Sequence, residues 1–203
     1  PTGKARETTP SGAMERLVRE GYIVAAPDLV DRGETAPRDF LRGPDNPRTR
    51  VLQWFGAISV GRSITGIQAA DLVKLVRALR MRPDVSAGEI SGIARGELAP
   101  VLLHAAAFEP AISAVALVSP LVSYHALATT RLYDPRFIPN GVAGMLTAYD
   151  LPDLAAALAP RPLLVLNAVD AAAAPLDEAS VAAEYEGAVR QYRPRKAGDR
   201  FPL

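Results

Sequence analysis

The chain contains no cysteine and only two histidines among its 203 residues. The absence of cysteine excludes a disulfide framework and a thiolate metal site, and two histidines are too few for a histidine-rich metal site. No apolar run is long enough to span a bilayer, and no signal peptide is recognisable. We therefore expect no metal and no other cofactor, and the sequence does not identify a compartment.

The chain also lacks an excess of charge of either sign. Its 23 basic and 22 acidic residues give a formal net charge of +1. A near-balanced chain does not indicate a bulk polyanionic or polycationic partner, so neither nucleic acid nor a membrane surface is expected to bind it. No phosphate-binding loop occurs, and Gly61 and Gly66 are too far from a convincing strand end to form a dinucleotide fingerprint.

What the sequence does contain is typical of a globular protein. Apolar residues make up 49% of a chain long enough to bury one sizeable core, which favours a single domain over residues 1–203. Continuous apolar runs predict buried strands at residues 22–26, 89–93, 112–118 and 163–169. Apolar residues at helical spacing predict helices after Ser11 and at residues 67–80, 99–108, 151–158 and 177–192.

Other segments are less regular. Residues 31–50 are rich in Arg, Pro, Gly and Asp and are predicted to be a surface excursion. Residues 51–60 are predicted to form either a short helix or a packed loop, and residues 134–140 a loop. Strands that alternate with helices predict the α/β class, with a parallel sheet covered by helices on both faces.

The segment 89–109 joins a strand to a helix through a glycine-containing turn over residues 94–98. A helix that begins directly after a strand exposes the side chain at the turn and directs unpaired backbone N–H groups toward it. In α/β-hydrolases such a turn is the nucleophile elbow, G-x-S-x-G. This turn contains no serine, and an ordinary strand–turn–helix of another α/β fold is the alternative.

The nucleophile position can be placed in two registers. Gly92 to Gly96 reads literally as G-x-A-x-G, with Ala94 in place of the nucleophile. Counting back from residues 103–108 of the helix places it at Gly96 instead. We prefer Gly96, because a helix that packs on the sheet has a fixed number of residues between its packed positions and the turn. Neither alanine nor glycine can attack a carbonyl carbon.

Five segments in order span most of the chain and carry a family resemblance. They are residues 21–28 with 33–35, residues 61–66 with Asp71, the turn with Ala105–Ala107, Ser123 with Tyr124, and residues 149–153 running into 159–164. Together they resemble the acetyl-xylan-esterase-like and glucuronoyl-esterase-like α/β-hydrolases of bacterial polysaccharide utilisation. The resemblance implies an α/β-hydrolase-like, doubly wound, mostly parallel sheet, and members of this family are often exported.

The resemblance also implies roles for individual residues. Asp170, at the end of the predicted strand 163–169, matches the catalytic acid of the family; a loop aspartate that ends a strand is the alternative. The catalytic His should lie beyond the last helix and one further strand. His104 and His125 lie elsewhere, and we expect both at the surface or half buried. The oxyanion hole would use N–H groups near Gly3 and that of Glu97.

Polar and charged residues near the turn can be interpreted either as part of a site or as having structural or solvent-exposed roles. Arg95 and Glu97 could pair with each other or fill the vacated site, or be two solvated charges near a helix start. Arg62 and Ser63 lie in a segment near the active-site face of such hydrolases; the alternative is that Ser63 caps the following helix. The serines nearest to strand ends do not make a persuasive elbow, and these are Ser91, Ser119 and Ser123.

The preferred hypothesis is a degenerate relative of carbohydrate esterases that has lost its Ser–His chemistry. It would act as a scaffold or bind an acylated carbohydrate or another small ligand. The alternatives are a working carboxylic-ester hydrolase whose His lies outside these residues, and a structural domain of a larger polypeptide. The sequence leaves the oligomeric state open.

The resemblance also predicts that the sheet is incomplete at both ends. The strand that precedes the oxyanion loop and the strand that precedes the catalytic His are not encoded in the chain. Residues 1–203 are therefore expected to be an excerpt of a longer hydrolase-like polypeptide, or a truncated product. The alternative is a rearranged sheet in which residues 22–26 pair directly with residues 90–93.

Overall fold

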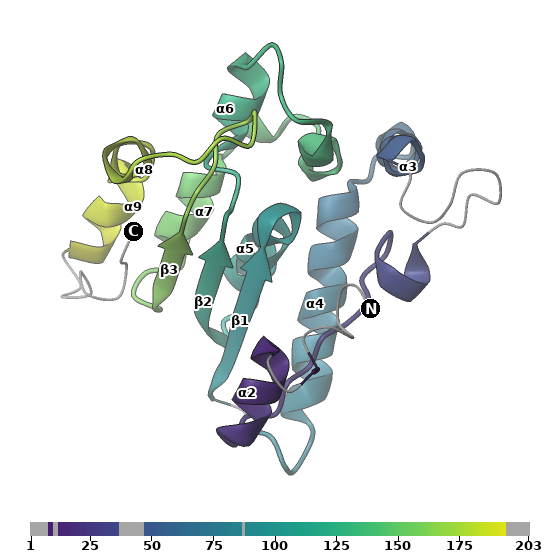
Figure 1. The fold of residues 1–203 in the computed structure, drawn as a ribbon, viewed down its shortest axis with the longest axis vertical. Helices are drawn as coiled ribbons and strands as arrows, with labels where there is room; N and C mark the ends of the chain where they lie inside the picture. Colours follow the sequence, from purple (N-terminus) through teal and green to yellow (C-terminus); the bar gives the residue numbers. More distant parts are fainter. Residues whose placement is uncertain (1–7, 10–11, 37–46, 87, 194–203) are drawn as a thin grey trace. The chain divides into compact units, whose positions relative to one another are not determined.

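The structure is a computed structural model that describes residues 8–9, 12–36, 47–86 and 88–193 (Figure 1). The chain falls into two compact units, Pro1–Asp45 and Asn46–Leu203, and each is described here by itself. A single domain over residues 1–203 stays a prediction. In the described part of the chain, no helix combines the length and hydropathy needed to cross a membrane.

The first unit contains helix α2 (Ala13–Arg19), as predicted. Gly21 follows it with a φ of 91°, in the left-handed region that glycine favours after a helix. A 3-10 turn, η1 (Gly33–Thr35), comes later. The strand predicted at residues 22–26 is wrong, because these residues form no strand. A strand exists through hydrogen bonds to a neighbouring strand, and an apolar run without such a partner has no ladder.

The second unit is built around a parallel sheet in the order β1-β2-β3. Its strands are β1 (Ile90–Arg95), β2 (Ile112–Val118) and β3 (Leu163–Leu166). The predicted strand 163–169 ends early, because Asn167 has a φ of 51° and leaves the extended region. Val169 then returns to form an isolated parallel bridge with Leu121. The α/β class with a parallel sheet is therefore confirmed.

Helices of the second unit follow the predicted pattern in part. Residues 51–59 belong to a helix, α3 (Pro47–Ser59), the first of the two predicted alternatives, and this helix begins within the surface excursion predicted at residues 31–50. The helix at Tyr124–Thr129 was not predicted. The single helix predicted at residues 177–192 is two helices, which meet at Tyr185 because its ψ of 11° departs from helical geometry. The remaining helices are α4 (Ile64–Arg80), α5 (Ala99–Phe108), α6 (Tyr124–Thr129), α7 (Leu151–Ala157), α8 (Glu178–Glu184) and α9 (Glu186–Tyr192).

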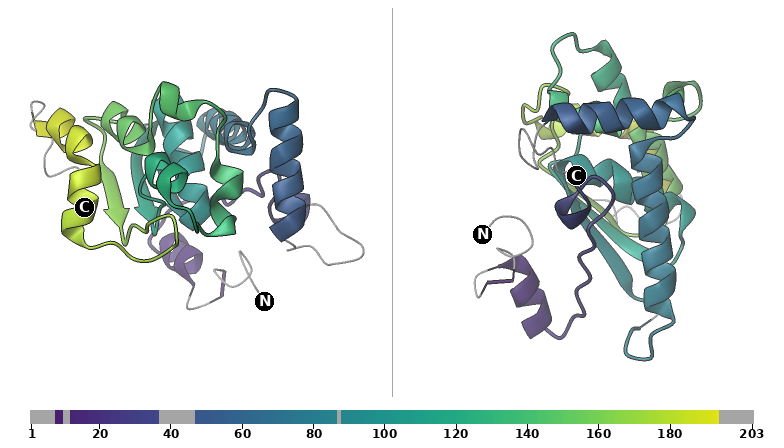
Figure 2. Two further views of the ribbon diagram at one scale, coloured as in Figure 1. Left: turned by 90° about the horizontal axis from the view of Figure 1, so that it is seen from above. Right: turned by 90° about the vertical axis from the view of Figure 1, so that its right-hand side faces the viewer.

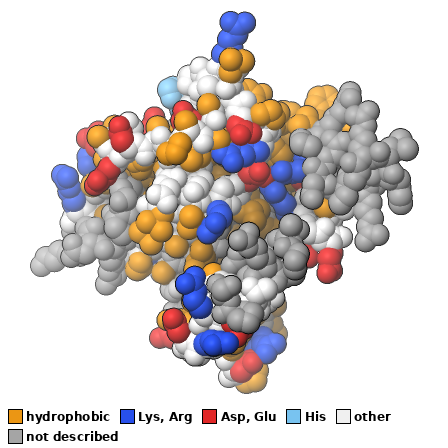
Figure 3. All heavy atoms as spheres, in the orientation of Figure 1, with side chains coloured by type: hydrophobic (Ala, Val, Ile, Leu, Met, Phe, Trp, Pro, Cys, Tyr) orange, Lys and Arg blue, Asp and Glu red, His pale blue; other side chains and the backbone are white. Residues whose placement is uncertain are grey.

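One face of the sheet carries the core. Helices α4, α5 and α7 lie side by side behind the strands, and α9 packs against α7 (Figures 1 and 2). Helix α5 is buried over most of its length because nearly all of its residues are apolar. On the face turned to the viewer, apolar side chains gather over the strands (Figure 3), where Ile93 is 66% exposed. The doubly wound arrangement, with helices on both faces, thus stays a prediction.

Candidate functional site at the strand-to-helix turn

Gly96 is the residue that turns the chain from β1 into α5. It begins the 3-10 turn η2 (Gly96–Leu98) and has a φ of 56°. A Cβ at this position would meet no atom within 4 Å, so the backbone presents position 96 to open space. A nucleophile elbow displays its serine in the same way, on a strained turn between strand and helix. Ala94, the alternative position, lies inside β1 and is paired with Leu117.

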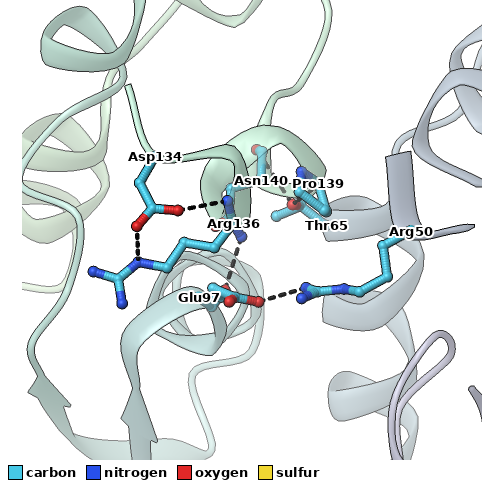
Figure 4. A network of polar contacts seen from close by, with 7 residues as sticks. All are labelled: Arg50, Thr65, Glu97, Asp134, Arg136, Pro139 and Asn140. Atoms are coloured by element: carbon cyan, nitrogen blue, oxygen red, sulfur yellow. Dashed lines mark hydrogen bonds and ion pairs between the residues drawn. The ribbon is translucent and has the colours of Figure 1, made fainter. Parts of the chain in front are cut away.

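Glu97, the next residue, is held by two parts of the second unit. Its carboxylate oxygen Oε2 forms an ion pair with Nη2 of Arg50 from α3 (Figure 4), and the two side chains are 18% and 19% exposed. Its backbone carbonyl accepts a hydrogen bond of 2.7 Å from Nδ2 of Asn140. Glu97 is therefore neither paired with Arg95 nor a solvated charge, and Arg95 itself is exposed. Arg50 and Asn140 were both missed by the sequence analysis.

Asn140 belongs to a short segment that packs against the turn. It ends the 3-10 helix η3 (Pro135–Asn140), which lies within the loop predicted at residues 134–140, and its side chain is 2% exposed. The hydroxyl of Thr65 donates to the carbonyl groups of Pro139 and Asn140, at 3.2 and 3.3 Å. The indole N–H of Trp54 donates to the carbonyl of Gly141 at 2.9 Å. Helices α3 and α4 thus fix Asn140 next to the turn.

The other end of η3 reaches the loop that contains Asp170. The backbone N–H of Asp134 donates to the carbonyl of Ala171 at 2.7 Å. The carboxylate of Asp134 accepts from the backbone N–H of Arg136 at 2.9 Å and lies 3.4 Å from its Nε (Figure 4). Residues 134–140 therefore run between the strand-to-helix turn and the Asp170 loop.

Asp170 follows β3 at the same edge of the sheet as Gly96, because both strands are parallel. β2 separates β1 from β3, which places their ends about 10 Å apart at the usual strand spacing. The Oδ1 atom of Asp170 accepts a hydrogen bond of 2.8 Å from the N–H of Ala174. The carboxylate thus closes a turn within its own loop. In the described part of the chain, no hydrogen bond or ion pair joins it to the turn at Gly96.

The two histidines lie in different environments. His104 in α5 is 5% exposed, so its expected place at or near the surface is wrong. One ring nitrogen, Nδ1, lies 2.6 Å from the carbonyl oxygen of Pro100, and Nε2 lies 2.9 Å from Oη of Tyr149. His125 is exposed, as expected, and its backbone N–H donates to Asp150. Both nitrogens of the buried ring are thus engaged away from the turn.

The remaining predicted residues have structural roles or lie outside the described part. Ser63 caps α4 by accepting a hydrogen bond of 3.0 Å from the N–H of Gly66, while Arg62 is exposed. Ser123 caps α6 in the same way, and Ser119 follows β2 with a φ of 50°. Gly3 lies outside the described residues.

The turn therefore lies at a helix start, beside the buried carboxamide of Asn140 and the ion pair between Arg50 and Glu97. Among the described residues, no cluster of His, Asp and Glu has the geometry of a metal site. The Oδ1 atom of Asn140 is buried and has no hydrogen-bond partner. An unpartnered buried acceptor is uncommon in folded proteins, and it fits a bound water or a ligand donor.

Comparison with known proteins identifies the fold. No family model matches the sequence, and no curated protein matches it. The structure is similar to one described as a "putative acetyl xylan esterase" from Bacteroides fragilis NCTC 9343, with a TM-score of 0.69 and 18% sequence identity. The match covers 91% of this chain and 47% of that chain, so this chain spans about half of the length of its relative. The similarity supports a hydrolase-like fold.

Proposed function

We propose that this chain is a degenerate relative of carbohydrate esterases that binds a small ligand, such as an acylated carbohydrate, at the strand-to-helix turn without cleaving it. The observation that carries the proposal is the turn itself. Gly96 has a left-handed φ and faces open space, which is the geometry of an elbow, and in the preferred register it stands where such hydrolases carry their serine. The fold similarity to the esterase supports the choice of ligand class.

The surroundings of the turn support the absence of hydrolysis. A serine hydrolase needs a hydroxyl within hydrogen-bond reach of a base, and the base in turn needs an orienting acid. Gly96 supplies no hydroxyl, and both ring nitrogens of His104 are occupied by Pro100 and Tyr149. The Asp170 carboxylate is hydrogen-bonded to Ala174. The described residues thus lack an assembled triad.

Other features of the turn support binding. Backbone N–H groups at a helix start lack partners within the helix. In α5 the N–H of Ala99 donates to the carbonyl of Gly96 and Pro100 has none, so only the N–H groups of the preceding turn, Gly96–Leu98, could donate to a ligand carbonyl. Asn140 adds the unpartnered acceptor Oδ1 beside the same turn. A donor at the open turn suits the acyl carbonyl of a ligand, and the buried Oδ1 beside it could accept from a ligand hydroxyl or from a water that bridges to one.

Two measurements test this function. An organophosphonate serine probe and a generic aryl ester should give no stoichiometric adduct and no burst. Calorimetric titration with an acetylated xylo-oligosaccharide should give binding that Asn140→Ala weakens about tenfold, the effect of one lost hydrogen bond. Lys74→Ala, an exposed change on α4, is the matched control and should not alter the affinity. An adduct mapped to any serine would overturn the proposal, and so would the absence of binding.

A further inference from the structure

One dipeptide of the second unit is chemically labile. The chain contains three asparagines, and only Asn140 is followed by glycine. In such a pair the backbone nitrogen of the glycine can attack the side-chain carbonyl carbon of the asparagine, because no side chain shields it. Asn46 precedes a proline, which has no N–H, and Asn167 precedes an alanine, whose side chain hinders the attack. Asn140–Gly141 is therefore the site in the chain most prone to lose ammonia.

Close packing explains why glycine stands at position 141. A Cβ at Gly141 would lie 3.3 Å from the carbonyl oxygen of Ile138 and 3.4 Å from Nε1 of Trp54. The first distance is shorter than an ordinary contact of a Cβ atom, so a side chain would force η3 or α3 to shift. The indole N–H of Trp54 also donates to the carbonyl of Gly141, which requires this close approach. The packing of α3 against η3 thus favours glycine here, and the labile dipeptide results from it.

The folded structure holds both reacting groups in other contacts. Nδ2 of Asn140 donates a hydrogen bond of 2.7 Å to the carbonyl of Glu97, and the backbone N–H of Gly141 donates one of 3.0 Å to the carbonyl of Ile138. Asn140 is 2% exposed, so water has little access to its side chain. Ring closure requires the nitrogen of Gly141 to lose its hydrogen and Nδ2 to leave, so both hydrogen bonds must break first. The reaction therefore proceeds from a locally opened state.

We propose that Asn140 is a spontaneous modification site, whose conversion is gated by the opening of η3 and permanently separates η3 from the strand-to-helix turn. In the opened state the nitrogen of Gly141 forms a bond to Cγ of Asn140. The Cγ–Nδ2 bond breaks, and the nitrogen leaves as ammonia with the hydrogen that Gly141 has lost. Water then opens the resulting succinimide ring to aspartate or to isoaspartate, in which the backbone runs through Cγ. Water is the only co-reactant that the step needs.

Neither product fits the closed site. The new carboxylate has no hydrogen to donate to the carbonyl of Glu97, which would then face a negative charge. The two guanidinium groups drawn in Figure 4 are engaged, that of Arg50 with Glu97 and that of Arg136 with Asp134. Oδ1 of Asn140 is buried and already lacks a hydrogen-bond partner, so no donor is in place for a second oxygen. A buried carboxylate without a donor is costly, and the modified segment therefore stays detached.

The modification does not depend on a ligand. If the turn binds a ligand as proposed, conversion of Asn140 ends that binding, since the acceptor Oδ1 leaves the turn together with η3. That consequence rests on the proposed function. The decisive measurements follow the mass and the stability of the chain, so their outcome is independent of binding.

Mass spectrometry of the peptide that contains Asn140 tests the gating. At mildly alkaline pH the native chain should convert at least about tenfold more slowly than the chain in concentrated urea, because only the opened fraction reacts. Thr65→Val removes the hydroxyl that donates to the carbonyl groups of Pro139 and Asn140. It should speed the native conversion about fivefold, the effect of one lost hydrogen bond. Thr129→Val, which removes a similar bond to the carbonyl of His125 in α6, is the matched control and should leave the rate unchanged. Equal rates in native and urea-unfolded chains, or equal rates in the two variants, would refute the gating.

Asn140→Asp tests whether the product fits, without waiting for the reaction. A carboxyl group buried without a donor has a pKa above that in the unfolded chain, so the folded chain binds more protons and loses stability as the pH rises. The unfolding constant of Asn140→Asp, measured in urea, should therefore rise at least about tenfold relative to the wild type from acidic to neutral pH. Asn140→Leu has a similar shape and no charge, and it should keep the pH dependence of the wild type. The same pH dependence in both variants would show that the closed site accepts a carboxylate and would overturn the proposal, even if Thr65→Val failed to fold.

Discussion

Arg50 and Glu97 are separated by 47 residues in the chain, and their side chains form an ion pair beside the turn that connects β1 to α5. Both side chains are largely removed from water, so each needs the other to offset its desolvation. A ligand at Gly96 would therefore meet a paired carboxylate, and the exposed guanidinium of Arg95 stands one residue before it.

The first prediction concerns this pair. Arg50→Met should destabilise the protein by about 1–3 kcal/mol, because the largely buried Glu97 carboxylate loses the guanidinium with which it forms an ion pair. The free energy of unfolding in urea measures the effect. Glu97→Gln in the Arg50→Met background should recover part of the loss. If the loss of unfolding free energy in the double variant equals the sum of the losses in the two single variants, the two side chains have no coupling energy.

The second prediction concerns the backbone at Gly96. Gly96→Ala should destabilise the protein by about 1–2 kcal/mol, because a side chain disfavours the left-handed region at a φ of 56°. Gly187→Ala is the matched control. Gly187 lies in α9 with open space around it, so alanine should stabilise by about 0.5–1 kcal/mol. Urea unfolding of the two variants should give opposite signs; equal signs would contradict the strained turn.

The third prediction concerns pH. The folded-state pKa of His104 is lowered by burial, so between that value and 6.5 the unfolded chain binds more protons than the folded one. The stabilisation that neutral His104 provides is fully present above pH 6.5 and is lost as the pH falls toward the folded-state pKa. Urea unfolding of the wild type and of His104→Gln from pH 7.5 to 5 should show a decline that the variant lacks. Parallel pH curves would assign the decline to other groups.

The fourth prediction concerns Arg161, which lies in one of the segments that carry the family resemblance. Its guanidinium donates to the carbonyl groups of Ala106, Glu109 and Ile112, at 2.7, 3.3 and 2.9 Å, and so closes the C-terminal end of α5. Arg161→Met should cost about 2–3 kcal/mol of unfolding free energy, because buried carbonyl groups lose a charged donor. Arg80→Met, an exposed change on α4, should lie within about 0.5 kcal/mol of the wild type.

The local pattern of apolar residues was sufficient to predict many of the strands and helices of the second unit. The run Ile112–Val118 is apolar and rich in β-branched residues, and it forms β2 as predicted. The helix at 67–80 was predicted from its periodicity, although it begins three residues earlier at the Ser63 cap. The position of Gly96 at the turn also followed from counting back along α5, since packing on the sheet fixes that spacing.

Prediction from this local pattern failed where the structure of a segment depends on contacts with residues distant in the sequence. Residues 22–26 have the composition of a buried strand, but a strand forms only when another strand pairs with it. His104 was expected near the surface, yet α5 is apolar on all sides, and that is the sequence signal of a wholly buried helix.

The sequence alone determined that neither position 94 nor position 96 carries a hydroxyl or thiol, because alanine and glycine occupy these positions whatever the fold. The tertiary structure decided which residues surround the strand-to-helix turn. Arg50 and Asn140 come from segments 47 and 43 residues away from Glu97, and neither is part of a motif. Side-chain contacts across such separations depend on how helices pack against the sheet, and local sequence periodicity contains no information about that packing.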